Sequence, residues 1–579
     1  MKPDITTFFS NPASPRQKQY EAVRTIFVEG VSYEKTAKKF GYKISALYAI
    51  VRNVRVGKLK LFPEVPKGPS QRRTPKETRD SVVEYRKNDN LSTMDIHERF
   101  KKDGVNIAVS TIERILKDAG FDKLKRRPFT ERGVTAKNKI IPECSEDLDL
   151  DELKPFNLDC PVAGIYFFLP YIIESGILDI VKKCKLPGSS IIGSTQACLS
   201  ILLLKLIGNE RLSHMDSLDH EPALGIFAGL NVLPKTTYMN TYSCRTSEQM
   251  LLDLQDELLQ KFMSTFPKLY GGEFINLDFH SIPHYGETAE MEKVWCGARG
   301  KRMRGANTVL AQDSKNNVVL YTRADILRKE ETEEIKKFIN YWKKLKGEIN
   351  ETLVFDCKFT KYSILDEIDA DGIKFITLRK RHKKLIESVS EIPEEEWKKV
   401  RLAIPKRKYT KVLIHENETI LTKKGNSLRQ FIIKDNGRAQ PTFIVTNDKN
   451  LSETKVLEVY AKRWRIENKI AELVSFFNLN ALSSPVMIRI HFDILWTFIA
   501  DTLYQRFKQD LRRFEKCTAK SIFKKFIDMP GRVTYDGNKF QIKIRKRAYT
   551  PILRSIPKLE KTIKVPWLEN KEIEIVWTA

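Results

Sequence analysis

The chain has 579 residues and carries 101 Lys and Arg against 74 Asp and Glu, which gives a net charge of +27 at pH 7. Its hydrophobic fraction of 41% is enough for folded cores and excludes a wholly disordered chain, and its length predicts roughly three to five domains. So large a positive charge is typical of proteins that bind a polyanion such as nucleic acid.

Membrane, secreted and zinc-binding classes of protein are not expected. No uninterrupted apolar run approaches the roughly 18 residues of a membrane span, and the first residues lack the apolar core of a secretory signal. The eight cysteines form no CxxC pair and the eight histidines form no HExxH motif, which argues against a disulfide scaffold and against zinc chemistry. We therefore expect a reduced, intracellular protein with no membrane partner.

The first part of the chain, residues 1–135, holds 29 Lys and Arg against 16 Asp and Glu, which is about half of the net charge. It contains two similar helical patterns, separated by a basic, Pro-rich linker at 59–75. In each pattern, short helices and a glycine-containing turn lead into a third helix, a spacing typical of helix-turn-helix units. The predicted helices cover 15–29, 32–40 and 44–55, and then 78–88, 91–104 and 108–120.

We predict a first helix-turn-helix DNA-binding unit over 1–62, and a linker with a second unit over 63–134. Each unit could instead be a plain helical bundle. The start of each third helix holds the candidates for reading bases, which are Lys43, Ser45, Tyr48, Ser110, Thr111 and Arg114. An acidic stretch that begins at Glu143 marks the boundary to a larger body.

The next region, 135–268, is predicted to be a helical domain. Residues 160–184 and 194–208 are strongly apolar and are interpreted as buried helices rather than membrane segments. A further apolar helix is expected to end at Gly229, and Pro234 marks a turn.

From about residue 270 the pattern changes to that of a mixed α/β domain. Strands are predicted over 273–282, 307–313 and 317–326, then a helix over 330–347, a short strand that ends at Asp356, a helix over 362–368 and a strand over 373–381. This order of elements is typical of a ribonuclease H-like α/β fold. That fold places Asp278, on the first strand, beside Asp356 at the end of the fourth.

Paired carboxylates at such a place predict a metal centre. Carboxylate oxygens are ligands that Mg²⁺ prefers, and two such ions can activate water on one side of a phosphate and stabilise the leaving oxygen on the other. A third acid, Glu467, is predicted on a helix over 456–477, on one stripe with Tyr460 and Arg463. The plainer alternative is an intrahelical Arg463–Glu467 ion pair. We predict a metal-dependent nuclease centre with Asp278, Asp356 and Glu467 as catalytic residues and metal ligands, Mg²⁺ as the cofactor and Mn²⁺ as a possible substitute.

Residues from about 195 to 510 resemble the DDE transposases of bacterial and archaeal insertion sequences, in the group with a Tyr-x2-Arg-x3-Glu-x6-Lys signature. Tyr460, Arg463 and Glu467 match that signature, and the segments LDFHSIPHYG and LVFDCKF resemble the motifs around the two catalytic aspartates. The Lys position of the signature is Val474 in this chain. The resemblance implies that Tyr460 and Arg463 hold DNA phosphates.

The resemblance also implies a β-rich domain between the second Asp and the Glu. Residues 385–440 show strand alternation, so we predict a catalytic core over 269–384 and 441–510, interrupted by an antiparallel β insertion. The C-terminal region, 511–579, contains a predicted hairpin with an Asp-Gly turn.

Several basic segments are further candidates for DNA contact, although each could be a solvated face. They are the runs 379–384, with Lys380 and Arg381, and 406–409, and a Gly/Arg loop over 296–307, with Arg302 and Arg304. His280 and His284 are expected to support the end of the first strand. Cys357 is expected on the side of its strand opposite to Asp356, in the core.

The resemblance implies a transposase that binds the terminal inverted repeats of its element, cleaves the phosphodiester bonds at the ends and joins the freed 3′-hydroxyl to target DNA. Its partner would be double-stranded DNA, in a synaptic complex that contains a homodimer. It would act at the nucleoid in the cytoplasm of a prokaryotic cell. The alternatives are an endonuclease without strand transfer and a non-catalytic DNA-binding regulator derived from a transposase.

Overall fold

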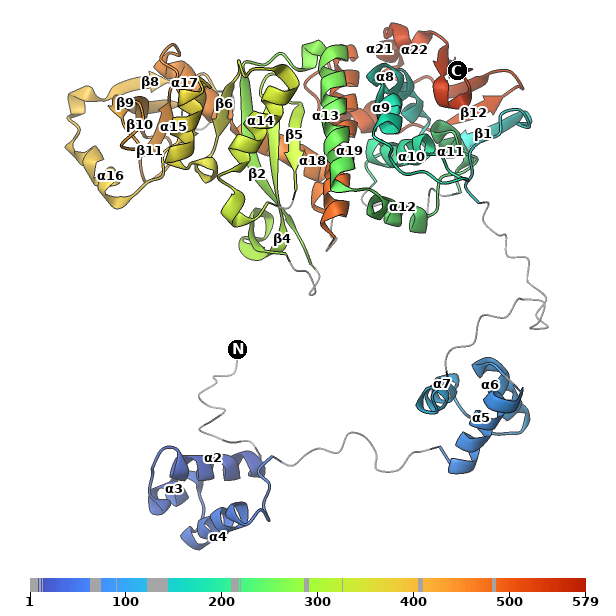
Figure 1. Ribbon diagram of the computed structural model, residues 1–579, viewed down its shortest axis with the longest axis vertical. Coiled ribbons are helices and arrows are strands. Elements are labelled where there is room, and N and C mark those ends of the chain that lie inside the picture. Colours follow the sequence, from blue (N-terminus) through green and yellow to red (C-terminus); the bar gives the residue numbers. More distant parts are fainter. Residues whose placement is uncertain are drawn as a thin grey trace. The chain divides into compact units, whose positions relative to one another are not determined.

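The computed structural model describes residues 9, 12, 14–62, 74–89, 91–121, 144–209, 218, 220–285, 291–324, 326–404, 410–481 and 486–579. The chain divides into two compact units, Met1–Lys139 and Ile140–Ala579, which are described separately (Figure 1). The predicted basic run 406–409 and most of the predicted linker 59–75 lie outside the described residues.

The described residues of the first unit form two groups of three helices, each with its own small core. The first group contains α2 (Pro15–Phe27), α3 (Tyr33–Phe40) and α4 (Ile44–Arg55), and the second contains α5 (Lys76–Asp89), α6 (Thr93–Lys102) and α7 (Val109–Asp118). Ala22 and Leu47 are fully buried in the first core, and Val82 and Ile112 are fully buried in the second. The helices predicted for this part of the chain are therefore present, with ends that differ by a few residues.

Side-chain caps and a glycine set several helix ends in these groups. Ser32 accepts a hydrogen bond from the backbone N–H of Lys35 at the start of α3, and Ser92 forms a capping box with Asp95 at the start of α6. Gly41 has a φ of 60° at the end of α3, a left-handed conformation that favours glycine. The chain turns there into α4.

The second unit is built on a ten-stranded sheet with the order β3-β4-β2-β6-β7-β11-β10-β9-β8, in which β5 also pairs with β4. The strands β2, β6 and β7 are parallel neighbours, and the other pairs are antiparallel. Each strand predicted between 273 and 381 is present. The strand bounds are β2 Phe274–Pro283, β3 Lys293–Cys296, β4 Lys301–Asp313, β5 Val319–Arg323, β6 Thr352–Phe355, β7 Phe375–Leu378, β8 Lys398–Arg401, β9 Lys411–Thr419, β10 Leu428–Lys434 and β11 Thr442–Thr446.

The region 385–440 was expected to form an antiparallel β insertion. It holds the antiparallel strands β8, β9 and β10, which continue the main sheet, because β11 pairs with β10 along one edge and with β7 along the other. One prediction about this sheet is wrong. The expected Gly/Arg loop over 296–307 is mostly strand. Strands β3 and β4 pair as a hairpin, and only 297–300 form its turn.

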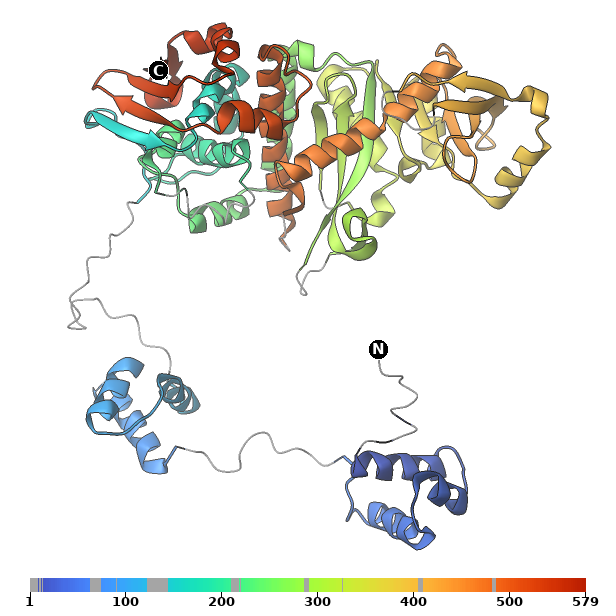
Figure 2. The same cartoon turned by 180° about the vertical axis from the view of Figure 1, so that it is seen from behind.

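Helices cover both faces of the sheet. The helices α14 (Glu334–Lys346) and α15 (Tyr362–Ala370) lie on one face, and α17 (Glu453–Lys462) and α18 (Trp464–Ser475) cross the opposite face, as the two views show (Figures 1 and 2). The short helix α16 spans Lys383–Glu387. Because side chains of a strand alternate between faces, Ile275 and Leu277 of β2 enter the main core, whereas Phe274 packs with the residues of α17.

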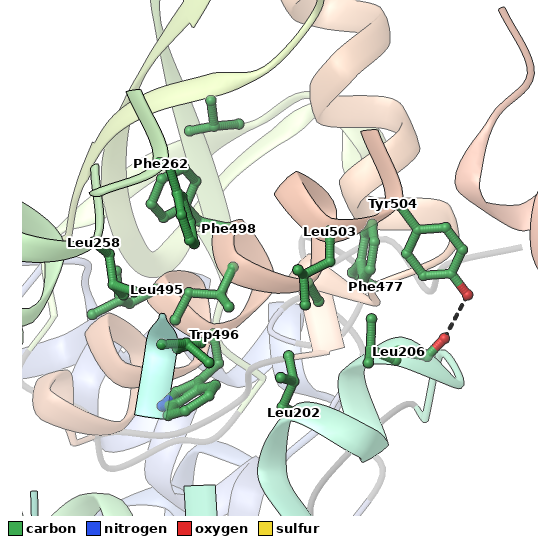
Figure 3. Close-up of a cluster of buried hydrophobic side chains, with 14 of the residues drawn as sticks. Leu202, Leu206, Leu258, Phe262, Phe477, Leu495, Trp496, Phe498, Leu503 and Tyr504 are labelled. Carbon is green, nitrogen blue, oxygen red and sulfur yellow. Dashed lines mark hydrogen bonds between the residues drawn. The ribbon is translucent and has the colours of Figure 1, made fainter. Parts of the chain in front are cut away.

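A helical body packs beside the sheet, and the long helix α19 (Met487–Asp510) joins the two by contacting α10, α13 and β5. Trp496, Phe498 and Leu503 of α19 are buried there, and the Tyr504 hydroxyl donates a 2.6 Å hydrogen bond to the Leu206 carbonyl (Figure 3). The other helices are α8 Leu169–Ser175, α9 Ile177–Lys183, α10 Ser194–Leu206, α11 Pro222–Ala228, α12 Thr236–Tyr242, α13 Glu248–Thr265, α20 Ala519–Ile522, α21 Thr550–Arg554 and α22 Pro557–Glu560.

A second, five-stranded sheet closes the far side of this body, with the order β1-β12-β13-β15-β14. Its strands are β1 Phe156–Cys160, β12 Gly531–Tyr535, β13 Phe540–Arg545, β14 Ile563–Val565 and β15 Lys571–Thr578. The predicted C-terminal hairpin is present as β12 and β13, with Gly537 at a φ of 99° in its turn.

Among the described residues, no single helix has the length and apolar composition to cross a membrane. A bent pair, Ala163–Ser175 with Ile177–Lys183, meets those two criteria when its parts are taken together.

Candidate active site

Two aspartates lie side by side at one level of the main sheet, Asp278 on β2 and Asp356 directly after the end of β6. In the parallel pair of β2 and β6, Leu277 is opposite Phe355, so Asp278 and Asp356 follow at the same level of the sheet. The Asp278 Oδ1 atom accepts a 2.9 Å hydrogen bond from the N–H of Phe279, and the Asp356 carboxylate accepts one from the N–H of Cys357. The predicted juxtaposition of these two carboxylates is therefore present in the fold.

Arg463 connects the sheet to the third predicted acid. The helix predicted over 456–477 is broken at this residue into α17 and α18. The Arg463 Nη1 atom donates to Asp278 Oδ2 at 2.8 Å, and Nη2 donates to Glu467 Oε1 at 3.2 Å. The plainer interpretation, an i, i+4 pair of Arg463 and Glu467, is present, and the same guanidinium also reaches Asp278 on the strand.

Glu467 does not lie on a core-facing stripe as the sequence predicted. Its side chain is 59% exposed, whereas that of Arg463 is 13% exposed. Tyr460, Arg463 and Glu467 do share one side of the two helices, because all three line the same cavity. That side faces the cavity rather than the core, and Glu467 is therefore open to solvent.

Burial and charge act against each other at this site. The pKa of Asp278 is raised, mainly by burial and further by the negative charge of Asp356, while Arg463 and the hydrogen bond from Phe279 lower it. The pKa of Arg463 is raised: burial opposes its charge, but Tyr460 and the surrounding carboxylates outweigh that cost. The two aspartates are thus close enough to repel each other, and Arg463 compensates part of that repulsion.

Asp356, Arg463 and Glu467 line a cavity of about 830 Å³. One side of the cavity is polar and the other is an apolar wall made by side chains of β7, β9, β10, β11 and α17. Polar groups at the cavity are Asp356, Arg381, Asn436, Arg438, Tyr460, Arg463 and Glu467. A phosphate placed there would find arginines and carboxylates at the same surface.

A divalent cation suits the oxygen donors of Asp278 and Asp356, and their mutual repulsion is what such a cation would relieve. Glu467 meets Arg463 instead of the aspartates. Within the described ranges, no group of three or more His, Cys, Asp or Glu side chains is gathered closely enough to hold a metal ion. The chemistry of the donors therefore fits a metal, with Glu467 as a third ligand only after its side chain has turned from Arg463.

The neighbours of the two aspartates are only partly as predicted. His280 supports its strand, because its Nε2 atom pairs with Asn480 Oδ1 at 2.7 Å, and His284 is also buried. Cys357 was expected in the core on the far side of the strand, but it is only half-buried and lies at the same cavity as Asp356. The reason is that β6 ends at Phe355, and a 3-10 turn follows, so strand alternation does not extend to Cys357.

The other predicted DNA contacts are spread over the surface. Lys380 and Arg381 are exposed, and Arg381 lines the same cavity as Asp356. Arg302 and Arg304 are exposed on β4, opposite Trp295 and Lys293 of β3. In the first unit, Lys43, Ser45, Tyr48, Ser110 and Arg114 are exposed and Thr111 is half-buried. Val474, at the Lys position of the signature, is partly buried against the main core.

Sequence reasoning did not find Asn436 and Arg438, which line the cavity from the turn between β10 and β11. The segment Asp435–Arg438 has the composition of an ordinary turn, and Asp435 indeed has a positive φ of 59°. Only the pairing of β11 with β7 places that turn near the aspartates.

Residues 270–503 match the family model described as "Transposase DDE domain". No curated protein matches the chain.

Two solved structures align with parts of the chain. The piggyBac transposase synaptic complex with hairpin DNA aligns with 9% identity and a TM-score of 0.30, over 66% of this chain and 88% of that one. The Mos1 transposase paired-end complex with the left transposon end aligns with 8% identity and a TM-score of 0.14, over 62% of this chain and 76% of that one. TM-scores well below 0.5 do not establish a common fold for the whole chain.

Proposed function

We propose that the chain is a DNA transposase that binds the terminal inverted repeats of its own insertion sequence, cleaves the phosphodiester bonds at the ends and joins the freed 3′-hydroxyl to target DNA. The observation that carries this proposal is the placement of Asp278 and Asp356 on neighbouring parallel strands, with Glu467 tied to Asp278 through Arg463, inside a transposase domain. The net charge of +27 suits a DNA substrate.

The strand order β5-β4-β2-β6-β7 supports a ribonuclease H-like core. In that core Asp278 and Asp356 would hold Mg²⁺ or Mn²⁺, and Glu467 would complete the ligands. Bound there, the metal would supply an activated water and charge stabilisation for in-line displacement at phosphorus.

The residues of the chain itself then position the DNA. Arg463 has a planar guanidinium, which suits bidentate contact with a phosphate. Its hydrogen bonds to Asp278 and Glu467 compete with such a contact, so we propose that DNA and metal together replace this ion pair. Tyr460 and Arg381, at the same cavity, would hold the strand near the carboxylates.

The first unit would recognise the inverted repeats. Its two three-helix groups support helix-turn-helix units over 1–62 and 63–134, and the exposed start of each third helix suits contact with bases. A homodimer that holds two DNA ends, in a prokaryotic cell, completes this proposal.

The decisive experiment uses the DNA that flanks the gene, which would contain the inverted repeats. We expect the purified full chain with Mg²⁺ to cut the ends of this DNA and to join a pre-cut end to a target plasmid. Asp278→Asn should lower cleavage at least ~1,000-fold, or ~4 kcal/mol of transition-state stabilisation, yet still bind the DNA ends in a mobility-shift assay. Asp371→Asn, at an exposed Asp of the same domain, is the matched control and should cut normally.

The same assays separate the alternatives. Cutting without joining of a pre-cut end would indicate an endonuclease. If the natural chain and Asp278→Asn both bind the ends and neither cuts, the chain is a DNA-binding regulator and the catalytic proposal is wrong.

A further inference from the structure

A second cavity, of about 310 Å³, lies on the other flank of α17 from the 830 Å³ cavity that Asp356 lines. Its walls come from the start of β2, the turn between β4 and β5, and the helices α17 and α18. The residues that line it are Gly271, Glu273, Phe274, Asn276, Ser314, Lys315, Lys455, Val459, Lys462 and Arg465. Four of these side chains are cationic and one is acidic.

The cations converge from separate parts of the chain. Lys455 and Lys462 are seven residues apart on α17, so they lie on the same helix face. Arg465, at the start of α18, donates a 3.0 Å hydrogen bond to the Ser314 carbonyl, which draws it to the turn that carries Lys315. This arrangement brings together side chains that are distant in sequence, unlike a simple charged run.

Their positive charge is only partly compensated within the protein. Lys462 has a 3.4 Å contact with Glu458, and the Lys455 ammonium lies 5.6 Å from the centre of the Phe274 ring. Like charges in one cavity repel each other. A bound anion would remove that repulsion, so the cavity is suited to an anionic group.

The position of the cavity relates it to the candidate active site. Phe274, Asn276 and Asp278 alternate onto the same face of β2, so Asn276 is roughly 7 Å from Asp278 along the strand. Residues at the junction of α17 and α18 contact both sites. Arg463 contacts Asp278 at the candidate active site, and Arg465 contacts Ser314 at the second cavity. A polynucleotide held at the carboxylates would therefore have neighbouring backbone phosphates within reach of the cationic cavity.

We propose that this cavity is a phosphate-binding site, and that its phosphate belongs to the backbone of the DNA strand held at Asp278 and Asp356. The source of the phosphate rests on the proposed function, whereas the anion site itself does not. Lys455 and Lys462 supply charge, and Ser314 and Asn276 supply polar groups at the same cavity. The contact is independent of sequence, because a phosphate carries no base identity.

The first test measures DNA affinity as a function of salt. We expect Lys455→Gln/Lys462→Gln to bind DNA roughly tenfold more weakly at low salt, to a similar extent for all sequences. The slope of log affinity against log salt concentration should fall by about 1, as for the loss of one phosphate contact. The matched control is Lys423→Gln/Lys424→Gln, on an exposed turn between β9 and β10, which should keep the natural slope.

The second test uses pyrophosphate as a probe without DNA. We expect pyrophosphate to raise the melting temperature of the natural chain relative to chloride at equal ionic strength, and to lose part of that effect in Lys455→Gln/Lys462→Gln. The single variant Lys315→Gln, at an exposed turn residue, repeats both tests if the double variant folds poorly.

The outcomes test separately the anion site, the source of its phosphate and the proposed function. An unchanged salt slope together with an unchanged pyrophosphate effect overturns the site. A pyrophosphate effect that is lost in the variants, with an unchanged DNA slope, assigns the site to free phosphate and rejects DNA as its source. If the natural chain binds no DNA at all, the proposed function fails, and the pyrophosphate test still decides the site.

Discussion

Helix α18 carries two charge clusters that differ in almost every physical respect. The first is formed by Arg463, Glu467 and Asp278. Arg463 and Glu467 line the 830 Å³ cavity, and Glu467 is 59% exposed. The second is centred on Lys469, which is 1% exposed and contacts Asp501 Oδ1 at 2.5 Å and Glu472 Oε2 at 3.7 Å. Lys508 joins this second cluster and donates to the Cys517 carbonyl at 2.9 Å.

The comparison teaches that charge on a helix indicates function only where a ligand can reach it. In the buried cluster, charged groups are paired with one another, and the pKa of Lys508 is lowered by burial and by the nearby Lys469. Those groups fix α18 against α19 and have no open side. In the cavity cluster, Glu467 is largely exposed and Arg463 lines an open cavity, so a ligand can reach both charges.

The largest expected effect on stability is that of Lys469→Met. This substitution should lower the free energy of unfolding by about 3–5 kcal/mol, because Asp501 is left as an uncompensated buried charge. Urea denaturation of the full chain measures it. Asn468→Ala, at the exposed neighbouring residue, should change stability by less than about 0.5 kcal/mol. Adding Asp501→Leu to Lys469→Met should recover part of the loss, and a loss below about 1 kcal/mol in the single variant would contradict the comparison.

The second test uses the two glutamates of α18 as a matched pair. Glu467→Gln should reduce DNA cleavage about 100- to 1,000-fold and leave stability within about 0.5 kcal/mol, because its side chain is exposed. Glu472→Gln should instead cost about 1–3 kcal/mol of stability, because it accepts a 2.6 Å hydrogen bond from the N–H of Ala519 inside the core. The measurements are the DNA cleavage rate and the urea midpoint of each variant. If both variants lost the same amount of cleavage and of stability, the distinction between the two clusters would be wrong.

The smallest effect concerns the pH dependence of the buried region. His491 of α19 is 6% exposed, and burial lowers its pKa from the usual 6.5. The unfolded chain therefore takes up a proton there before the folded chain does, so this group costs stability as the pH falls below about 6.5. His491→Gln should flatten the fall in stability between pH 7 and pH 5, with the difference at pH 8 taken as the packing cost. An unchanged slope would show that His491 is protonated in the folded chain.

The sequence predicted most of what depends on local pattern. Alternation identified β2 with Asp278, and the short apolar run before Asp356 identified β6, because both features are properties of neighbouring residues. The helix caps at Ser32 and Ser92 that the structure shows are equally local, because each contacts a residue within one turn of the helix. These signals suffice to bring the two aspartates together once the parallel order of the strands is assumed.

Long-range pairing and breaks in regular structure could not be predicted. The pairing of β11 with β7 depends on which strand edges meet in the folded chain, and no pattern of neighbouring residues specifies this pairing. The break at Arg463 likewise has no glycine or proline to indicate it, and its ion pair with Asp278 joins residues 185 positions apart. The exposure of Glu467 depends on the cavity beside it, and the position of Cys357 depends on the end of β6 at Phe355, so both were predicted wrongly.

The continuity of the large sheet sets a limit on how this chain can be shortened. Five residues of β10 cover β11, from Arg429 opposite Thr446 to Ile433 opposite Thr442. Removal of 398–434 would leave the backbone amides and carbonyls of β11 unpaired on an apolar strand, an open edge that tends to self-associate. A truncated chain should therefore aggregate, and a trimmed version that stays monodisperse would have to replace those strands with a polar cover for β11.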